Sequence, residues 1–191
     1  MLYPINLDLK GRRCLVVGGG EVAARKAKSL LECGAKVTLV APEIDQAVKK
    51  LGQKTKTLRL IRRSFRPGDL TETFLVVAAT DDRALNRSIS QRSRKRRILV
   101  NAVDQPADCL FTVPSVVRRG NLTIAISTNG ASPALSKQIR RELSKRYGPE
   151  FGRFLKRMAK ARKELLRQIP SAKERKRTFE KMVKAFFQKR K

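Results

Sequence analysis

Residues 13–23 read Arg-Cys-Leu-Val-Val-Gly-Gly-Gly-Glu-Val-Ala, an apolar run that ends in three glycines. The run at 13–17 is typical of a buried strand, and residues 22–31 have the apolar spacing of a helix. The β-branched run at 36–40 predicts a second strand, which Pro42 ends. Together these segments predict a βαβ unit of about thirty residues.

The glycines of this unit match the G-x-G-x-x-A motif of dinucleotide-binding proteins over residues 18–23. Gly18 allows a tight turn, Gly20 lets the backbone approach a pyrophosphate, and Ala23 lets the helix pack closely. The phosphates are expected at the helix N-terminus, where unpaired N–H groups and the helix dipole favour an anion. Because the motif follows a predicted strand and opens a predicted helix, it indicates nucleotide binding rather than a plain glycine turn.

Strand-like and helical segments continue to alternate after this unit. Further strands are predicted at 57–61, 74–79 and 98–100, with a helix over 83–94 before the last of them. This alternation is typical of an α/β fold with a parallel sheet and helices on both faces. We therefore predict a Rossmann-like sheet domain.

The pattern changes after Asp104. Strands are predicted at 109–113 and 122–126, joined by a turn at 118–121, and a helix is predicted to open at Ser132-Pro133. Two amphipathic helices follow, separated by Ile169-Pro170-Ser171. We predict three regions: an NAD-binding Rossmann-like domain over 1–112, a small sheet and helix over 113–147, and a basic helical C-terminal region over 148–191.

The composition is strongly basic and lacks histidine. The 191 residues include 45 Lys and Arg but 16 Asp and Glu, and the segment from Lys137 onward holds 21 Lys and Arg against 5 Glu. A field of this sign attracts anions without choosing among them. With no histidine, any catalysis must rest on Asp, Glu, Lys, Cys or hydroxyl groups, because the commonest proton-transfer side chain is missing.

Cysteine usage and hydropathy indicate a cytoplasmic protein. Three cysteines are scattered without C-x-x-C spacing, and no secretory leader precedes them, so free thiols and no disulfide are expected. The longest apolar runs, at 15–20 and 74–79, fall far short of the roughly 20 residues of a membrane span. No membrane partner is expected.

Acidic residues and a threonine stand where the predicted strands end. Glu43 is placed to accept hydrogen bonds from the ribose of NAD, but Pro42-Glu43 suits the start of a helix equally well. Thr80 and Asp81 end an apolar strand, where they can touch the cofactor, although helix capping by Asp81 or Asp82 is the commoner use.

Asp104 follows the predicted strand 98–100, again at the carboxyl end of the sheet. In a histidine-free chain it is a candidate proton acceptor. From spacing alone, a turn aspartate before Gln105-Pro106 is the more common use of such a residue.

An ordered set of segments links the chain to a known family. The segments are Pro4-Ile5, Val-Val-Gly-Gly-Gly-Glu-Val-Ala-Ala-Arg-Lys at 16–26, Ala-Ala-Thr-Asp-Asp at 78–82, Asn-Ala-Val-Asp at 101–104, Phe111 with Pro114-Ser115, Thr-Ile-Ala-Ile-Ser-Thr at 123–128, and Gly130 with Ser132-Pro133. With them the chain resembles the precorrin-2 dehydrogenase/sirohydrochlorin ferrochelatase family, the N-terminal part of sirohaem synthase.

The resemblance implies NAD-dependent oxidation of precorrin-2 to sirohydrochlorin in sirohaem biosynthesis, and in many members insertion of ferrous iron into the product. It also implies a homodimer, with 113–147 serving dimerisation and substrate binding. The family's key aspartate falls on Asp104, which reverses the preference for a turn role. Its NAD and substrate contacts fall on the following residues: Glu21, Val22, Pro42 and Glu43 for NAD, and Asn101, Ser127 and Thr128 for substrate.

Two departures from the family accompany the match. Asn129 stands where a second glycine is usual, in the loop expected to face substrate, and the segment after Gly148 is far more basic than usual. Two other functions remain open: a regulator that responds to NAD or a tetrapyrrole, and a nucleic-acid-binding protein using basic runs such as 173–177. Because the tail lacks interleaved aromatic residues, nucleic acid is not the expected partner.

Overall fold

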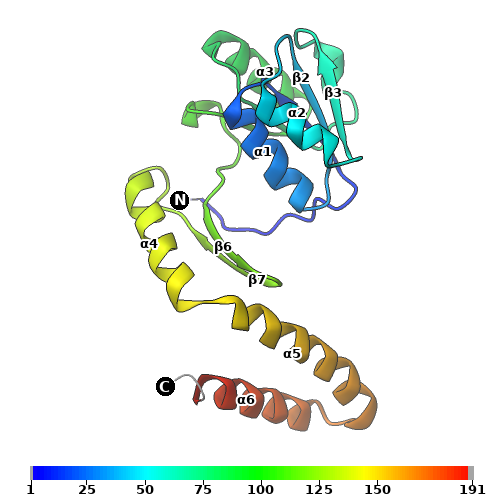
Figure 1. The fold of residues 1–191 in the computed structure, drawn as a ribbon, viewed down its shortest axis with the longest axis vertical. Coiled ribbons are helices and arrows are strands. Elements are labelled where there is room, and N and C mark those ends of the chain that lie inside the picture. Colours follow the sequence, from blue (N-terminus) through cyan, green and yellow to red (C-terminus); the bar gives the residue numbers. More distant parts are fainter. Residues whose placement is uncertain (1, 189–191) are drawn as a thin grey trace. The chain divides into compact units, whose positions relative to one another are not determined.

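The computed structural model describes residues 2–188 and divides into two compact units, with the boundary between Val113 and Pro114 (Figure 1). The predicted regions 1–112 and 148–191 include residues 1 and 189–191, which lie outside the described residues. No helix in 2–188 has the length and apolar character needed to cross a bilayer.

The first unit is built on a sheet of five parallel strands, as the alternating pattern predicted. The strands are β1 (Arg13–Val17), β2 (Lys36–Ala41), β3 (Leu58–Arg62), β4 (Leu75–Ala78) and β5 (Leu99–Ala102). Their order in the sheet is β3-β2-β1-β4-β5. The chain thus builds outward from β1 to β3 and then returns to the other side of β1. This reversal opens a crevice at the carboxyl ends of β1 and β4.

Helices cover both faces of this sheet because successive strand residues point to opposite sides. Helices α1 (Glu21–Glu32) and α2 (Gln46–Gln53) pack on one face, and α3 (Arg83–Lys95) packs on the other. Val16 of β1 belongs to the core under α1 and α2, whereas its neighbour Val17 belongs to the core under α3. Both side chains are almost fully buried.

The second unit begins with a hairpin of β6 (Ser115–Arg119) and β7 (Leu122–Ile126), which pair antiparallel. Arg119 pairs with Leu122, so the turn has two residues, and Gly120 takes a φ of +59° there. Three helices follow: α4 (Pro133–Arg146), α5 (Pro149–Gln168) and α6 (Ala172–Gln188). The second and third form a helical hairpin, in which Phe154 of α5 stacks on Phe186 of α6 with ring centroids 4.0 Å apart.

The predicted strand at 109–113 is wrong, and the paired strand begins at Ser115, two residues after the predicted strand would have ended. Residues 109–111 are instead tied to β5: the Leu110 N–H donates to the Val100 carbonyl at 2.8 Å, and the Asn101 amide donates to the Phe111 carbonyl at 3.0 Å. Pro114 then supplies no N–H for a ladder. Local apolar character indicates an extended segment but does not identify its partner.

Cys14 supplies a testable consequence of the buried sheet. Its side chain is 2% exposed in β1, and burial, together with the nearby Cys33, raises the pKa of its thiol to about 11. We expect iodoacetamide at pH 8 to leave Cys14 unmodified in the native protein while it modifies the half-buried Cys33. Peptide mass spectrometry measures both sites, and guanidinium-unfolded protein is the control in which both react. Equal native rates at the two cysteines would contradict the buried environment.

Candidate functional site

A cleft of about 800 Å³ lies at the carboxyl ends of the parallel strands in the first unit. The glycine-rich loop after β1 forms one wall, and the loops after β2, β3, β4 and β5 complete it. All nine residues predicted for cofactor binding or catalysis within this unit line the cleft: Gly18, Gly20, Glu21, Val22, Pro42, Glu43, Thr80, Asp81 and Asp104.

The three glycines of the loop have different surroundings. Gly18 has a φ of +123°, and a Cβ atom there would collide with the carbonyl oxygen of Ala79. A Cβ atom on Gly19 would collide with the carbonyl oxygen of Glu43. A Cβ atom on Gly20 would meet nothing closer than a carboxylate oxygen of Asp45, at 3.7 Å. Gly18 and Gly19 therefore let the loops pack together, and Gly20 leaves free space on the cleft side.

The sequence motif assigned no role to Gly19, and the structure supplies one. The Asp45 N–H donates to the Gly19 carbonyl at 3.0 Å, so the glycine loop is fastened to the segment that follows β2. This contact joins positions 26 residues apart, and it depends on how β1 and β2 are aligned. The signal that pointed to Gly19 was only the run of three consecutive glycines.

Helix α1 begins immediately after this loop, with Gly20 as its N-cap and no side-chain acceptor capping it. Its first intrahelical bond runs from the Ala24 N–H to the Gly20 carbonyl at 3.0 Å. The N–H groups of the first turn precede that bond and have no helical acceptor. An uncapped helix N-terminus next to an open glycine is a favourable place for a phosphate group.

Glu43 does not start a helix. Helix α2 starts at Gln46 with Asp45 as its N-cap, so Glu43 stands in the loop before it, exposed at the cleft. Of the two interpretations left open by the sequence, the helix start is wrong. The contact between Glu43 and a ribose stays a prediction, and the carboxylate is placed at the end of β2, where such a contact is made in Rossmann domains.

The loop after β4 is held by a buried amide that the sequence pattern did not single out. Asn86 of α3 is 2% exposed. The hydroxyl of Thr80 donates to the Asn86 side-chain oxygen at 2.8 Å, and the Asn86 amide donates back to the Thr80 carbonyl at 2.8 Å. Thr80 is therefore fixed in one orientation at the cleft wall. A polar residue on the apolar side of a helix was the only available signal.

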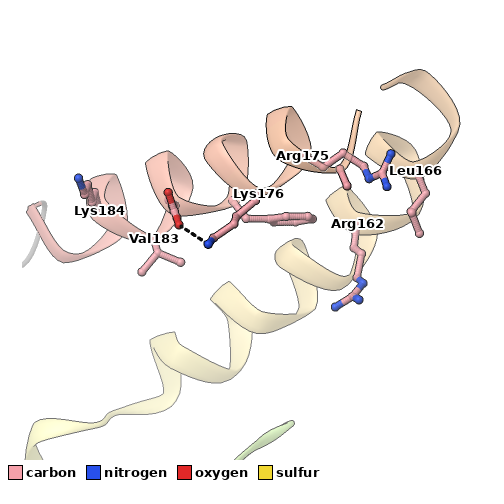
Figure 2. A pocket seen from close by; sticks show the side chains of 9 residues that line it. Arg162, Leu166, Arg175, Lys176, Val183 and Lys184 are labelled. Carbon is pink, nitrogen blue, oxygen red and sulfur yellow. Dashed lines mark ion pairs between the residues drawn. The ribbon is translucent and has the colours of Figure 1, made fainter. Parts of the chain in front are cut away.

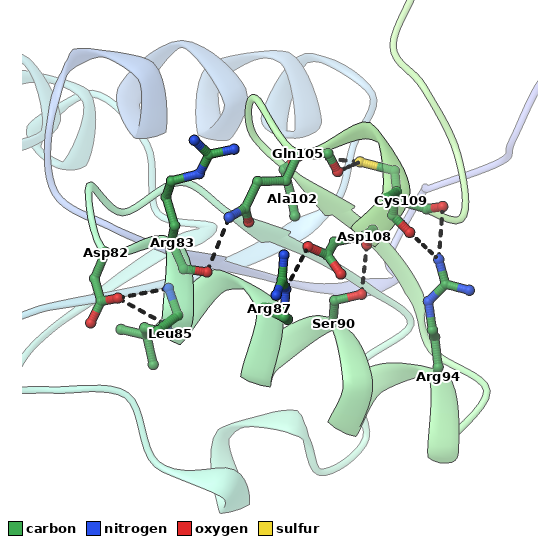
Figure 3. Close-up of polar contacts among 12 residues, drawn as sticks. Asp82, Arg83, Leu85, Arg87, Ser90, Arg94, Ala102, Gln105, Asp108 and Cys109 are labelled. Carbon is green, nitrogen blue, oxygen red and sulfur yellow. Dashed lines mark hydrogen bonds and ion pairs between the residues drawn. The ribbon is translucent and has the colours of Figure 1, made fainter.

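The two adjacent aspartates, Asp81 and Asp82, have different roles, which the sequence alone did not distinguish. The Asp82 side chain caps α3 by accepting from the N–H groups of Ala84 at 2.8 Å and Leu85 at 3.0 Å (Figure 3). Asp81 is exposed and lines the cleft. Capping by Asp82 leaves the Asp81 carboxylate available for a ligand.

This division can be measured with a matched pair of variants. Asp82→Ala is expected to lower the free energy of unfolding by about 1 kcal/mol, the usual value of an N-cap, and Tm by about 2–4 °C for a chain of this size. Asp81→Ala is expected to leave Tm unchanged. Thermal unfolding followed by circular dichroism compares the two, and equal losses of Tm would contradict the assignment of the cap to Asp82.

Asp104 stands in the turn after β5 with a φ of +58°, in the left-handed region that few residues other than glycine adopt. Aspartate and asparagine are among the side chains that tolerate it. The preceding Val103 N–H donates to the Ala78 carbonyl of β4 at 2.9 Å, which holds the turn against the sheet. The Asp104 side chain is exposed and lines the cleft.

The segment after Asp104 is fastened to α3 by polar contacts (Figure 3). The Gln105 amide nitrogen donates to the Arg83 carbonyl at 3.0 Å, and the Ser90 hydroxyl donates to the Asp108 carbonyl at 2.6 Å. The Arg94 guanidinium also donates to the Cys109 carbonyl at 3.1 Å. Asp104 therefore has a rigid support on both sides, which suits a residue that must keep one position.

Gln105 is a further cleft residue that the sequence treated only as part of a turn. It is 6% exposed, and its side-chain oxygen is buried with no hydrogen-bond partner among the described residues. Its amide nitrogen already donates to Arg83, so the orientation of the amide is set. A buried acceptor of this kind needs an N–H or a water to bond.

Lys26 adds a basic side chain to the surroundings of Asp104. Burial, reinforced by Arg25, lowers the pKa of the Lys26 ammonium group, whereas Cys109 and Asp104 act in the opposite direction. The ammonium group of α1 and the Asp104 carboxylate therefore interact electrostatically. The sequence match included Lys26 without giving it a role.

The three predicted substrate residues are placed elsewhere. Asn101 is 7% exposed and is not among the residues that line the cleft; its amide holds the Phe111 carbonyl. Ser127 and Thr128 belong to the second unit, in the loop between β7 and α4. Thr128 accepts at its hydroxyl from the Ser132 N–H at 3.1 Å, and Ser127 accepts from the Asn129 N–H at 3.1 Å. Their substrate contacts stay predictions.

The loop of the second unit also shows why asparagine is compatible with position 129. Asn129 has a φ of +50° and Gly130 a φ of +88°, so two successive residues lie in the left-handed region. Asparagine is one of the few side chains that adopt this region at low cost. Asparagine therefore fits the backbone conformation of the loop and adds a polar side chain to it.

Comparison with known proteins gives matches along nearly the whole chain. Residues 5–115 match a family model described as putative NAD(P)-binding, and residues 119–146 match one described as sirohaem biosynthesis protein central. A siroheme synthase from Nitrosomonas eutropha is 38% identical over 185 residues, which cover 97% of this chain and 39% of that protein. One from Photorhabdus laumondii is 40% identical over 177 residues, covering 93% and 37% respectively.

The chain spans about two fifths of the length of these curated relatives. It covers much more of a solved structure, that of SirC, precorrin-2 dehydrogenase, with 36% identity and a TM-score of 0.76. That match includes 93% of this chain and 86% of SirC. The likeness therefore extends over both units, and the chain belongs to the family of precorrin-2 dehydrogenases and siroheme synthases.

Proposed function

We propose that this protein is an NAD-dependent dehydrogenase that oxidises precorrin-2 to sirohydrochlorin on the route to sirohaem. The observation that carries the proposal is the cleft of the first unit, where the glycine loop and Asp104 line one cavity. The relationship to SirC, a precorrin-2 dehydrogenase, supplies the substrate class.

The residues of the cleft fit a dinucleotide. The uncapped start of α1 and the open side of Gly20 suit the pyrophosphate, and Glu43 stands where the adenosine ribose is held in Rossmann domains. An acid at this place favours NAD over NADP because it would repel a 2′-phosphate. Thr80 and Asp81 complete the wall along which the cofactor would lie.

Oxidation of precorrin-2 removes one hydride and one proton from the macrocycle. NAD, when bound, supplies the acceptor for the hydride. We assign acceptance of the proton to the Asp104 carboxylate, because it is the acid of the β5 turn and is held rigidly at the cleft. The side chain of Gln105, which follows it in the chain, is buried, and its amide donates to the Arg83 carbonyl at 3.0 Å, which helps to hold the turn.

The same site bears on the two alternative functions that the sequence left open. A regulator requires the cleft to bind NAD but gives Asp104 no chemical task. A nucleic-acid-binding protein requires neither. The cationic side chains along the chain suit an anionic ligand in general, and a tetrapyrrole that carries many carboxylates is one such ligand.

The proposal also includes iron insertion, a homodimer and substrate contacts outside the cleft. Ferrous iron would be a second substrate, inserted into sirohydrochlorin after two pyrrole protons are removed, and the siroheme synthases among the relatives motivate this step. A homodimer and substrate contacts at Asn101, Ser127 and Thr128 come from the family resemblance. Sedimentation velocity measures the dimer directly.

An anaerobic assay tests the proposal. Purified protein is incubated with precorrin-2 and NAD, and NADH and the absorption spectrum of sirohydrochlorin are followed before ferrous iron is added. Formation of both products supports the dehydrogenase, and sirohaem formation faster than in the protein-free control supports iron insertion. NAD binding without NADH formation, with intact precorrin-2, would favour the regulator. Absence of both NAD binding and NADH formation would leave the nucleic-acid-binding protein as the remaining alternative.

A further inference from the structure

The helical hairpin of α5 and α6 has an apolar groove that the proposed reaction does not use. Its volume is about 590 Å³, and its apolar floor is defined here as the lining residues Leu166, Ala172, Phe179 and Val183. Figure 2 shows the groove and labels Leu166 and Val183. Leu166 is 57% exposed and Val183 is 37% exposed. These side chains face a cavity that the hairpin itself leaves open.

The groove is open because the hairpin packs tightly only at its other end. There, Phe151 and Phe154 of α5 contact Phe186 of α6, and both α5 residues are buried. None of the described residues of α6 is buried. Two packed helices cannot bury an apolar stripe that faces away from their contact. Such a stripe is buried only when a further element packs against it.

The rim of the groove is cationic. Arg162, Arg175, Lys176 and Lys184 surround the apolar floor, together with one acid, Glu180. That acid lies 4.0 Å from the ammonium group of Lys176, one helical turn away. The guanidinium of Arg175 donates to the carbonyls of Ile169 and Pro170 at 2.5 Å each, so it is held in place while keeping its charge. An occupant must therefore be apolar at its centre and negative at its edges.

The shape of the groove selects among occupants with that chemistry. A groove between two antiparallel helices accepts a third helix at the usual interaxial distance of about 8–10 Å. A membrane surface is covered by convex apolar faces rather than by a recess. Phosphate backbones match the rim but not the apolar floor. A second copy would bring the same cationic rim against this one.

We propose that the groove of α5 and α6 docks an acidic amphipathic helix of a partner protein, which would complete a three-helix bundle. The partner's apolar side chains would cover Phe179 and Val183, and its carboxylates would pair with the rim. From the length of α6, 17 residues, the docked segment would be about 16–18 residues long. The interaction would attach the enzyme to another protein through its second unit.

A pair of labelled peptides tests the proposal with the full chain. One has 18 residues with Leu at positions i, i+3, i+4 and i+7 and Glu between them, and the other has the same composition in scrambled order. Fluorescence anisotropy at about 150 mM salt is expected to show at least tenfold tighter binding of the patterned peptide. Equal binding of the two would mean charge attraction alone and would overturn the proposal.

Variants locate the binding to the groove. Leu166→Ser with Val183→Ser removes exposed apolar side chains and is expected to weaken the patterned peptide at least tenfold. Arg162→Glu with Lys184→Glu is expected to do the same and to reduce the dependence on salt. Matched controls are Leu135→Ser in α4, 52% exposed, and Lys95→Glu in α3, which are expected to have no effect. Circular dichroism and NAD affinity verify that each variant is folded.

Three results would show that the groove binds something other than an acidic helix. Conversion of a wild-type dimer to a monomer by Leu166→Ser with Val183→Ser would assign the groove to a second copy. Binding of duplex DNA, or of phosphatidylglycerol vesicles, that the same double variant abolishes would assign it to those ligands. Each of these results overturns the proposal, and each is independent of whether precorrin-2 is oxidised.

Discussion

Asp104→Asn is expected to lower kcat for precorrin-2 oxidation at least 100-fold while NAD affinity stays within about twofold of the wild type. The loss corresponds to removal of a general base, which contributes typically 10²–10⁴-fold. Asparagine keeps the size of the side chain and tolerates the φ of +58° at this position, so the turn is retained. Stopped-flow measurement of NADH formation gives kcat, and isothermal titration calorimetry gives the NAD affinity.

The control for this experiment is Asp104→Gly, which removes the side chain and relieves the left-handed backbone. It should leave Tm unchanged or slightly higher, and it should lose activity as the asparagine variant does. A kcat within threefold of the wild type in both variants would show that Asp104 is a turn residue. Loss of NAD affinity together with kcat would show that Asp104 holds the cofactor, and proton acceptance would have to be assigned elsewhere.

The position of the site was predictable because parallel strands end at one edge. Gly18, Thr80 and Asp104 are far apart in sequence, but each follows a segment recognised as a strand. An alternating pattern of strands and helices is sufficient to bring such positions to the same side of a sheet. The sequence could therefore name the residues that line the cleft without knowing the strand order.

The parts that escaped prediction depend on pairings between distant segments. Contact of Gly19 with the Glu43 carbonyl depends on the path of the loop after β2, and the Thr80 contact with Asn86 depends on how α3 is seated. The failure at 109–113 has the same origin, because the hydrogen bond from the Leu110 N–H to Val100 of β5 holds this segment away from a local hairpin. Hydrophobic periodicity records which residues are apolar but not which backbone groups meet.

Glycine-to-alanine substitutions at positions 19 and 20 are expected to separate folding from cofactor binding. In Gly19→Ala the new methyl group collides with the Glu43 carbonyl, so backbone must move, at a cost of about 1–3 kcal/mol or more. We expect Tm to fall by about 3–10 °C and NAD affinity to fall with it, since the loop carries the start of α1. Differential scanning calorimetry and NAD titration measure the two quantities.

Gly20→Ala is the matched counterpart, because its methyl group meets no protein atom closer than 3.7 Å. The residue has a φ of −85°, which alanine adopts freely, so the cost of a poorer N-cap is offset by the lower entropy of the unfolded chain. Tm should change by less than about 2 °C, whereas NAD affinity should fall at least tenfold if the pyrophosphate occupies the open side of the loop. Unchanged affinity in Gly20→Ala would mean that the cofactor lies elsewhere in the cleft, and an unchanged Tm in Gly19→Ala would mean that the loop after β2 yields without cost.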